Sequence, residues 1–218
     1  MAMNIESVRR QMVEQQIRTW DVFDPSLLSA FNGIPRHLFV PEEYADVAYA
    51  DTEIPLPHGQ CMLRPNIVGR MLQAVNIVKS DRVLEVGTGS GYVTACLAQL
   101  AGSVQSIDIF PEFVAAATKR LADLDIGNAS LQAMDAVTEL PAAKFDAILV
   151  SASMPEMDMR FVDALNEGGR LFIVVGHAPV MQALLVTRGA DDEIATAELF
   201  ETNIPPLVAP EPLAKFSF

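Results

Sequence analysis

Residues 83–92 read Val-Leu-Glu-Val-Gly-Thr-Gly-Ser-Gly-Tyr, a run of strand-forming residues followed by three glycines at alternate positions. Glycine has no Cβ, so such a turn lets a ligand lie directly against the main chain. A strand, a glycine-rich turn and a helix in this order are typical of a nucleotide-binding crossover. A tight turn without any ligand is the alternative interpretation. The chemistry of the ligand therefore decides what the protein does.

The glycine spacing excludes two common phosphate-binding loops. A dinucleotide fingerprint needs G-x-G-x-x-G, but Tyr92 holds the position of its third glycine, so the loop is not shaped for a pyrophosphate. A P-loop needs a lysine after its last glycine, and no lysine lies near this turn. The remaining candidate is a ligand that carries an adenosine and no phosphates.

The elements that must position this turn follow from the hydrophobic pattern, which alternates between strand and helix periods after residue 80. Strands are predicted at 82–86, 104–109, 129–133, 145–150 and 170–175, and residues 180–188 and 193–200 form a closing antiparallel pair. Helices are predicted between most of these strands, at about 91–100, 111–122 and 158–165.

The chain before residue 80 has a different pattern. An N-terminal helix buries one face, and two shorter helices are predicted at 25–31 and 67–75; the predicted apolar face of the first consists of Val8, Met12, Val13, Ile17 and Trp20. The proline-rich stretch between Ile34 and Pro65 is predicted to be an ordered loop region with one short strand or helix. We therefore expect an α/β protein with a Rossmann-like, doubly wound sheet in residues 81–218. Residues 1–80 form a helical and loop extension that packs on it, within one compact domain.

Composition and charge exclude several classes of function. The chain has 218 residues and a net charge of −13, which would repel phosphate backbones, so nucleic-acid binding is not expected. No apolar stretch is long enough to cross a membrane, and the N-terminus lacks a signal-peptide core. The two cysteines form no CxxC pair, which argues against a zinc site and fits a reducing compartment. We expect a cytoplasmic protein without a metal; the sequence does not determine its oligomeric state, and a monomer is favoured over an oligomer.

The sequence Glu-x-Gly-x-Gly-x-Gly at 85–91 resembles motif I of the class I S-adenosylmethionine-dependent methyltransferases. The resemblance implies that Glu85 lies near the ammonium group of S-adenosylmethionine, directly or through water. It also implies that the loop lies under the methionine part, with Gly87, Thr88, Gly89, Gly91 and Tyr92 as cofactor-binding residues.

Two acidic residues extend this candidate cofactor site. Asp108 ends the second strand about twenty residues after the glycines, where a carboxylate can accept hydrogen bonds from both ribose hydroxyls. A capping role before the next helix is the alternative, but that cap should fall nearer Phe110. Asp135 follows the third strand, where this class contacts the adenine amino group; a turn residue is the alternative. Ile109 and Ala136 are assigned to the site with these neighbours.

Five segments together are similar to the protein-L-isoaspartate O-methyltransferases: RRQMVEQQI, IPRHLFVPEEYADVAYAD, PLPHGQ, LEVGTGSGY and GGRLFIVVG, within about residues 8–176. The family repairs aged proteins by methylating the side-chain carboxylate of isoaspartyl residues. The resemblance implies an isoaspartyl peptide or protein as the partner. The nucleophile is a carboxylate that is already ionised at pH 7, so the site needs alignment and hydrogen-bond donors but no general base.

One departure from the family lies in the turn after PLPHGQ. The family has Thr-Ile-Ser-x-Pro there, and its hydroxyls hold the isoaspartyl carboxylate, but this chain has Cys61-Met62-Leu63-Arg64-Pro65. Leu63 occupies the key serine position and has no donor, so no catalytic residue is matched; Gln60, Cys61 and Arg64 are nearby candidates. Ala136 also stands where the family often has glycine.

Three functions therefore stay open. The first is an isoaspartyl methyltransferase with rebuilt carboxylate contacts, which is the function we expect. The second is a methyltransferase of the same fold with a more apolar acceptor, which Met62 and Leu63 favour. The third is a protein that binds S-adenosylmethionine without catalysis.

Overall fold

The structure is a computed structural model that describes residues 5–208; residues 1–4 and 209–218, at the outer ends of the two regions predicted above, lie outside the described residues. The described α-helices are α1 (Ile5–Met12), α2 (Pro25–Gly33), α3 (Pro65–Val75), α4 (Tyr92–Leu100), α5 (Pro111–Asp123) and α6 (Met159–Asp163). The described strands are β1 (Ile54–Pro55), β2 (Cys61–Met62), β3 (Arg82–Val86), β4 (Ser103–Asp108), β5 (Ala129–Ala133), β6 (Phe145–Met154), β7 (Leu165–His177), β8 (Val180–Arg188) and β9 (Ile194–Thr202). None of the described helices is long and apolar enough to cross a membrane.

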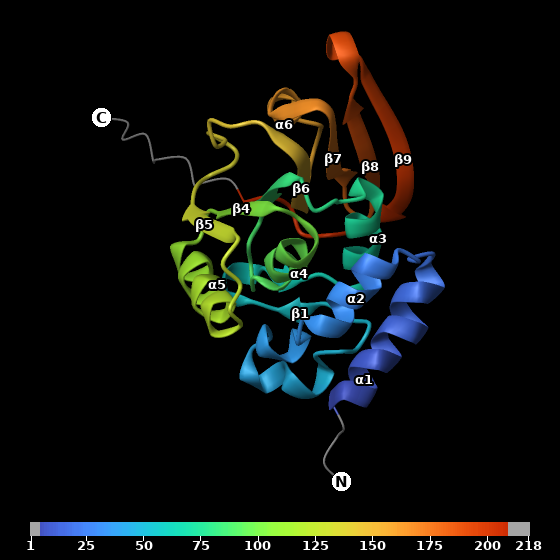
Figure 1. Ribbon diagram of the computed structural model, residues 1–218, viewed down its shortest axis with the longest axis vertical. Coiled ribbons are helices and arrows are strands. Elements are labelled where there is room, and N and C mark those ends of the chain that lie inside the picture. Colours follow the sequence, from blue (N-terminus) through green and yellow to red (C-terminus); the bar gives the residue numbers. More distant parts are fainter. Residues whose placement is uncertain (1–4, 209–218) are drawn as a thin grey trace, which may run out of the picture.

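The central sheet has seven strands in the order β5-β4-β3-β6-β7-β8-β9. Strands β5, β4, β3, β6 and β7 are parallel, and β8 and β9 add antiparallel at the edge. The predicted α/β doubly wound fold and its closing antiparallel pair are confirmed. Figure 1 shows the β8–β9 hairpin at the top of the molecule and the N-terminal helix α1 at the bottom.

Alternating side chains of the inner strands point to two separate hydrophobic clusters, as the period of two in a strand requires. On β6, Ala147 and Leu149 belong to one cluster, whereas Ile148 and Val150 belong to the other. The first cluster includes side chains of α2, α3 and α4 together with buried residues from Met12 to Ile204. The N-terminal extension therefore shares its core with one face of the sheet, and α6 contributes Phe161 to the other face.

The N-terminal extension departs from the prediction in two places. The chain after α1 continues as a π-helical turn, Val13–Ile17, and a 3₁₀ turn, Arg18–Trp20. Met12, Val13 and Ile17 are buried as predicted, but Trp20 is 43% exposed, so its assignment to the buried face is wrong. The tightening to 3₁₀ geometry changes the angle between successive side chains, so the helical period no longer predicts where Trp20 points.

The proline-rich stretch before α3 is more structured than predicted. It contains the short antiparallel pair β1–β2, with Ile54 opposite Met62, and three 3₁₀ turns, at Arg36–Leu38, Glu42–Val47 and Pro57–Gly59. The β1–β2 pair closes the loop between them, since the Leu56 N–H donates to the Gln60 carbonyl at 2.8 Å. This loop brings residues of the N-terminal extension to the carboxyl edge of the main sheet.

Candidate active site

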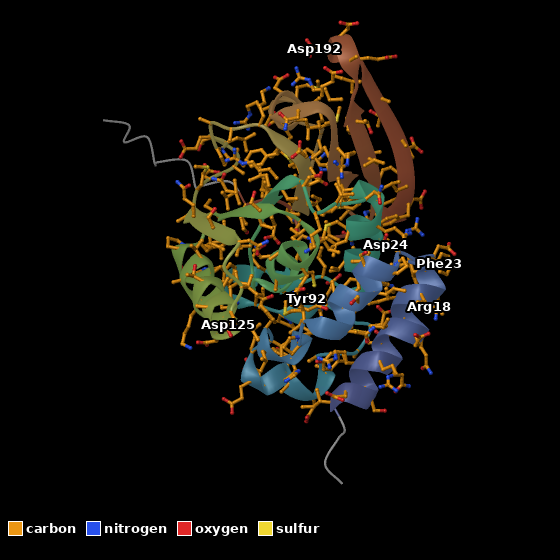
Figure 2. All side chains as sticks on the ribbon, in the orientation of Figure 1. Arg18, Phe23, Asp24, Tyr92, Asp125 and Asp192 are labelled. Carbon is orange, nitrogen blue, oxygen red and sulfur yellow. The ribbon has the colours of Figure 1, made fainter. Side chains whose placement is uncertain are left out.

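A pocket opens at the carboxyl ends of β3, β4 and β6, beside the point where the strand order reverses. Open α/β sheets bind their ligands at this position. Three segments far apart in the sequence meet there: the glycine turn after β3, the start of α5 after β4, and the β1–β2 loop with the turn that follows it. Tyr92, labelled in Figure 2, is buried, and its ring packs against those of Phe31 and Phe39 in the N-terminal part.

Most of the residues singled out in the sequence line this pocket, and four do not. The lining residues among them are Gln60, Cys61, Leu63, Gly87, Thr88, Gly89, Tyr92, Asp108, Ile109 and Ala136. The four that lie outside the lining are Arg64, Glu85, Gly91 and Asp135. The glycine turn and the Leu63 turn, separated by more than twenty residues, thus share one cavity.

The glycines of the turn adopt backbone angles that side chains disfavour. Gly87, Gly89 and Gly91 have φ values of +95°, +49° and +86°. A Cβ on Gly91 would lie 2.8 Å from the Cβ of Ala117, so Gly91 is needed for the close approach of α4 to α5. Gly87 and Gly89 line the pocket itself. The turn therefore exposes main-chain atoms of Gly87 and Gly89 to the cavity, while Gly91 allows α4 and α5 to pack closely.

Asp108 lies at the end of β4 and is only 7% exposed. Its Oδ2 accepts a hydrogen bond from the Gly89 N–H and its Oδ1 accepts one from the Phe110 N–H, both at 2.9 Å. Burial raises the pKa of Asp108, and these two backbone donors oppose the rise. Helix α5 has Phe110 as its N-cap residue, as the sequence predicts. Each carboxylate oxygen retains a lone pair, so Asp108 can still accept hydrogen bonds from a ligand's hydroxyl groups.

Asp135 is engaged in its own turn. Its Oδ1 accepts from the Val137 N–H and its Oδ2 from the Thr138 hydroxyl, both at 2.9 Å. The neighbouring Met134 and Ala136 line the pocket. In this structure the Asp135 carboxylate thus organises the turn that brings its neighbours to the cavity.

Glu85 lies beneath the glycine turn and is completely buried. Its Oε2 accepts hydrogen bonds from the hydroxyls of Thr94, at 2.5 Å, and Ser106, at 2.6 Å. Burial raises the pKa of Glu85 to about 8, although both hydroxyls lower it. The carboxyl group is therefore largely protonated at neutral pH in the absence of a ligand.

Replacement of Glu85 by glutamine should change how stability depends on pH. An unfolded glutamate has a pKa of about 4.3, so the folded protein retains a proton that the unfolded chain releases between roughly pH 4.5 and 8. Wild-type stability should fall as pH rises through this window, by an amount on the order of a few kcal/mol. Glutamine does not titrate, so we expect the melting temperature of Glu85→Gln relative to wild type to rise steadily from pH 5 to pH 8. Parallel melting profiles for the two proteins would refute this assignment.

The turn that corresponds to the family's Thr-Ile-Ser-x-Pro presents an apolar surface to the pocket. Leu63 is 7% exposed and lines the cavity together with Met62. Cys61 also lines it, and burial raises the pKa of its thiol to about 11, so the thiol stays neutral. The Arg64 side chain is largely exposed and lies 3.8 Å from the Glu53 carboxylate. Of the three candidates near Leu63, Gln60 and Cys61 thus reach the pocket, and Arg64 does not.

Arg36 is a pocket residue that the spacing arguments missed. It is completely buried, and its guanidinium donates to the carbonyls of Ala48 and Leu63, both at 2.9 Å. It also lies over the Tyr92 ring, 4.8 Å from the centroid. Burial lowers its pKa. Arg36 therefore ties the Leu63 turn to the N-terminal extension; the only signal in the sequence was its place within the IPRHLFVP segment.

Part of the pocket wall comes from the chain after β9. Ser153 at the end of β6 holds this segment: its N–H donates to the Pro205 carbonyl, its hydroxyl to the Ile204 carbonyl, and its own carbonyl accepts from the Leu207 N–H. Leu207 and Val208 then line the pocket. No sequence motif marked these residues, because only the closure of the sheet brings them to the cavity.

Comparisons with known proteins agree with this geometry. A sequence model of the family Protein-L-isoaspartate(D-aspartate) O-methyltransferase matches residues 7–211. Protein-L-isoaspartate O-methyltransferase 1 of Rhodopseudomonas palustris is 38% identical, over 98% of this chain and 91% of its own length. The Opitutus terrae Protein-L-isoaspartate O-methyltransferase is 42% identical, over 83% of this chain and 78% of its own length.

A solved structure shares the fold. A Plasmodium falciparum beta-aspartate methyltransferase, in complex with S-adenosyl-L-homocysteine, superposes with a TM-score of 0.79 at 21% identity. The superposition covers 94% of this chain and 98% of the other.

Proposed function

This chain belongs to the protein-L-isoaspartate O-methyltransferase family, whose members depend on S-adenosylmethionine, and we propose that it methylates the side-chain carboxylate of isoaspartyl residues in proteins. The observation that carries the proposal is the meeting of the glycine turn, Asp108 and the Leu63 turn in one pocket. The two cysteines are free, as in cytoplasmic proteins, and we place the reaction in that compartment.

The residues that line the pocket support the binding of S-adenosylmethionine. Asp108 would accept hydrogen bonds from the ribose hydroxyls, and Ile109, Phe110 and Phe113, which line the same pocket, would provide apolar surface for the adenine. The main chain at Gly87 and Gly89 leaves room for the methionine part. The cofactor, when bound, supplies an electrophilic methyl group on a positively charged sulfur. A positively charged cofactor above the turn would favour the ionised form of the buried Glu85 carboxyl.

The protein's own residues have a limited task in this reaction. An isoaspartyl carboxylate is ionised at neutral pH, so no side chain has to remove a proton. The pocket must exclude water and align the carboxylate oxygen with the methyl group, and correct alignment alone can account for a large part of a rate enhancement. The apolar residues Leu56, Met62 and Leu207 provide the exclusion of water.

A methyltransferase with a more apolar acceptor is the second candidate. The observation that favours it is the acceptor side of the pocket, where Met62, Leu63, Leu207 and Val208 present no hydrogen-bond donor in their side chains. An uncompensated carboxylate in such surroundings costs several kcal/mol.

Transfer of labelled methyl from S-adenosylmethionine distinguishes these functions. The protein is incubated with an isoaspartyl peptide, with the same peptide containing normal aspartate, and with a cell extract. Base-labile label on the isoaspartyl peptide alone supports the proposal. Base-stable label on an extract component supports the second candidate, since carboxyl methyl esters hydrolyse readily. Cofactor binding without any transfer contradicts both.

A further inference from the structure

We propose that Ser151 is the hydroxyl that holds the acceptor's carboxylate in this protein, in place of the hydroxyl missing at Leu63; this inference rests on the proposed function. Ser151 lies on β6 and lines the pocket. Its Oγ is buried, and no hydrogen-bond partner for it occurs among residues 5–208. A buried hydroxyl without a hydrogen-bond partner raises the free energy of the folded protein. A ligand group that accepts a hydrogen bond from it therefore binds more tightly.

The strand order places Ser151 on the acceptor side of the glycine turn. Strand β3 carries the turn and lies between β4, which ends in Asp108, and β6, which contains Ser151. A Cβ on Gly87 would lie 3.5 Å from the Cβ of Ser151, so this serine borders the first glycine directly. With the ribose held by Asp108 on the β4 side, the β6 side is left for the group that receives the methyl.

The neighbours of Ser151 in the pocket offer few other hydrogen-bond donors. Two positions further along β6, Ser153 fixes the segment that carries Leu207 and Val208. Within that segment Pro205 and Pro206 have no N–H groups, so its main chain offers no donor at these two positions. Met62 and Leu63, which line the same pocket, have no side-chain donor either. Among the described lining residues on the β6 side, Ser151 is therefore the side chain with an uncommitted hydroxyl.

The hydroxyl suits the chemistry of a carboxylate acceptor. A serine O–H can donate one charge-assisted hydrogen bond to one carboxylate oxygen and leave the other oxygen free to attack. A serine is neutral, so it orients the carboxylate without cancelling the negative charge that makes it a nucleophile. The methyl group passes to the free oxygen as its bond to sulfur breaks, and the serine keeps its proton throughout.

The test compares Ser151→Ala, Ser151→Thr and wild type in methyl transfer to an isoaspartyl peptide and in binding of S-adenosylhomocysteine. Loss of the hydroxyl should reduce kcat/KM by roughly tenfold to a hundredfold, mainly through KM, the range expected for a hydrogen bond to a charged group. Threonine should retain most of the activity. The affinity for S-adenosylhomocysteine should change less than about twofold in both variants, and Ser130→Ala, on the exposed part of β5, serves as the matched control.

The outcomes separate this inference from the proposed function. A wild type that methylates the isoaspartyl peptide while Ser151→Ala is unchanged overturns the role of Ser151 and leaves the function intact. Equal losses of S-adenosylhomocysteine affinity and activity in Ser151→Ala would assign the hydroxyl to the cofactor and likewise overturn the proposal. A wild type that neither methylates the isoaspartyl peptide nor binds it in the presence of S-adenosylhomocysteine overturns both.

Discussion

Leu63→Ser, combined with Cys61→Thr, should raise kcat/KM on isoaspartyl peptides by an order of magnitude or more, and the natural protein should be a slow isoaspartyl methyltransferase. Leu63 lines the pocket and has no donor in its side chain. An incompletely compensated carboxylate in this surface loses several kcal/mol of interaction, and each 1.4 kcal/mol is about a tenfold change in rate. Steady-state kinetics with an isoaspartyl peptide measure the effect.

The variant Leu63→Ala separates the two effects of the leucine on the reaction, which are the missing hydrogen-bond donor and the added bulk. Alanine removes the bulk without adding a donor, whereas serine removes the bulk and adds one. If kcat/KM rises with serine alone, the missing hydrogen bond limits the wild-type activity. If kcat/KM rises equally with serine and alanine, the bulk of the leucine limits it. Leu63 belongs to the hydrophobic cluster of the N-terminal extension, so both variants should lose stability, by roughly 2–5 kcal/mol for a leucine truncation, and melting curves must accompany the kinetics. Brisk wild-type activity that falls in the serine variant would contradict the prediction.

A double-mutant cycle connects this prediction with the role of Ser151. A second hydroxyl at position 63 would also donate to the carboxylate that Ser151 holds. Ser151→Ala should therefore lower kcat/KM less in the Leu63→Ser protein than in wild type. Residues that contact one ligand group are expected to show such coupling. Independent, additive effects would show that the two positions do not address the same carboxylate.

Asp108→Ala should weaken binding of S-adenosylhomocysteine by roughly 10- to 100-fold, corresponding to about 1.5–3 kcal/mol for hydrogen bonds to a charged group. The carboxylate would lose its contacts with the ribose, and the glycine turn would lose the acceptor that holds the Gly89 N–H. Isothermal titration measures the affinity, and circular dichroism checks that the fold is retained.

Asp108→Asn is the informative control for this site. Asparagine keeps the shape but replaces one acceptor oxygen with an NH₂ donor, which would face either the Gly89 or the Phe110 N–H. We therefore expect an affinity between those of alanine and wild type. Unchanged affinity in a folded Asp108→Ala protein would show that the ribose is held elsewhere.

The sequence predicted the elements of the core well because each depends on local patterns. The strand before the glycines, the helix after them and the position of Asp108 at the end of a strand were confirmed. Trp20 was assigned wrongly because the helix changes from α to π and then to 3₁₀ geometry, and no local sequence pattern predicts that change. The structure also showed that Glu85 is buried below the pocket, since burial depends on what packs above a strand and not on the strand itself.

The sequence by itself determined the fold class, the glycine turn and the family, because strand period, glycine spacing and motif order are properties of short segments. Tertiary structure alone decided which side chains line the pocket together. Arg36, Ser151 and Leu207 come from three distant parts of the chain, and they share a cavity only because β6 lies beside β3 and the segment after β9 returns to Ser153. The same closure directs Arg64 outward and Leu63 inward. Such contacts between distant segments depend on the packing of the whole sheet, and no local spacing specifies them.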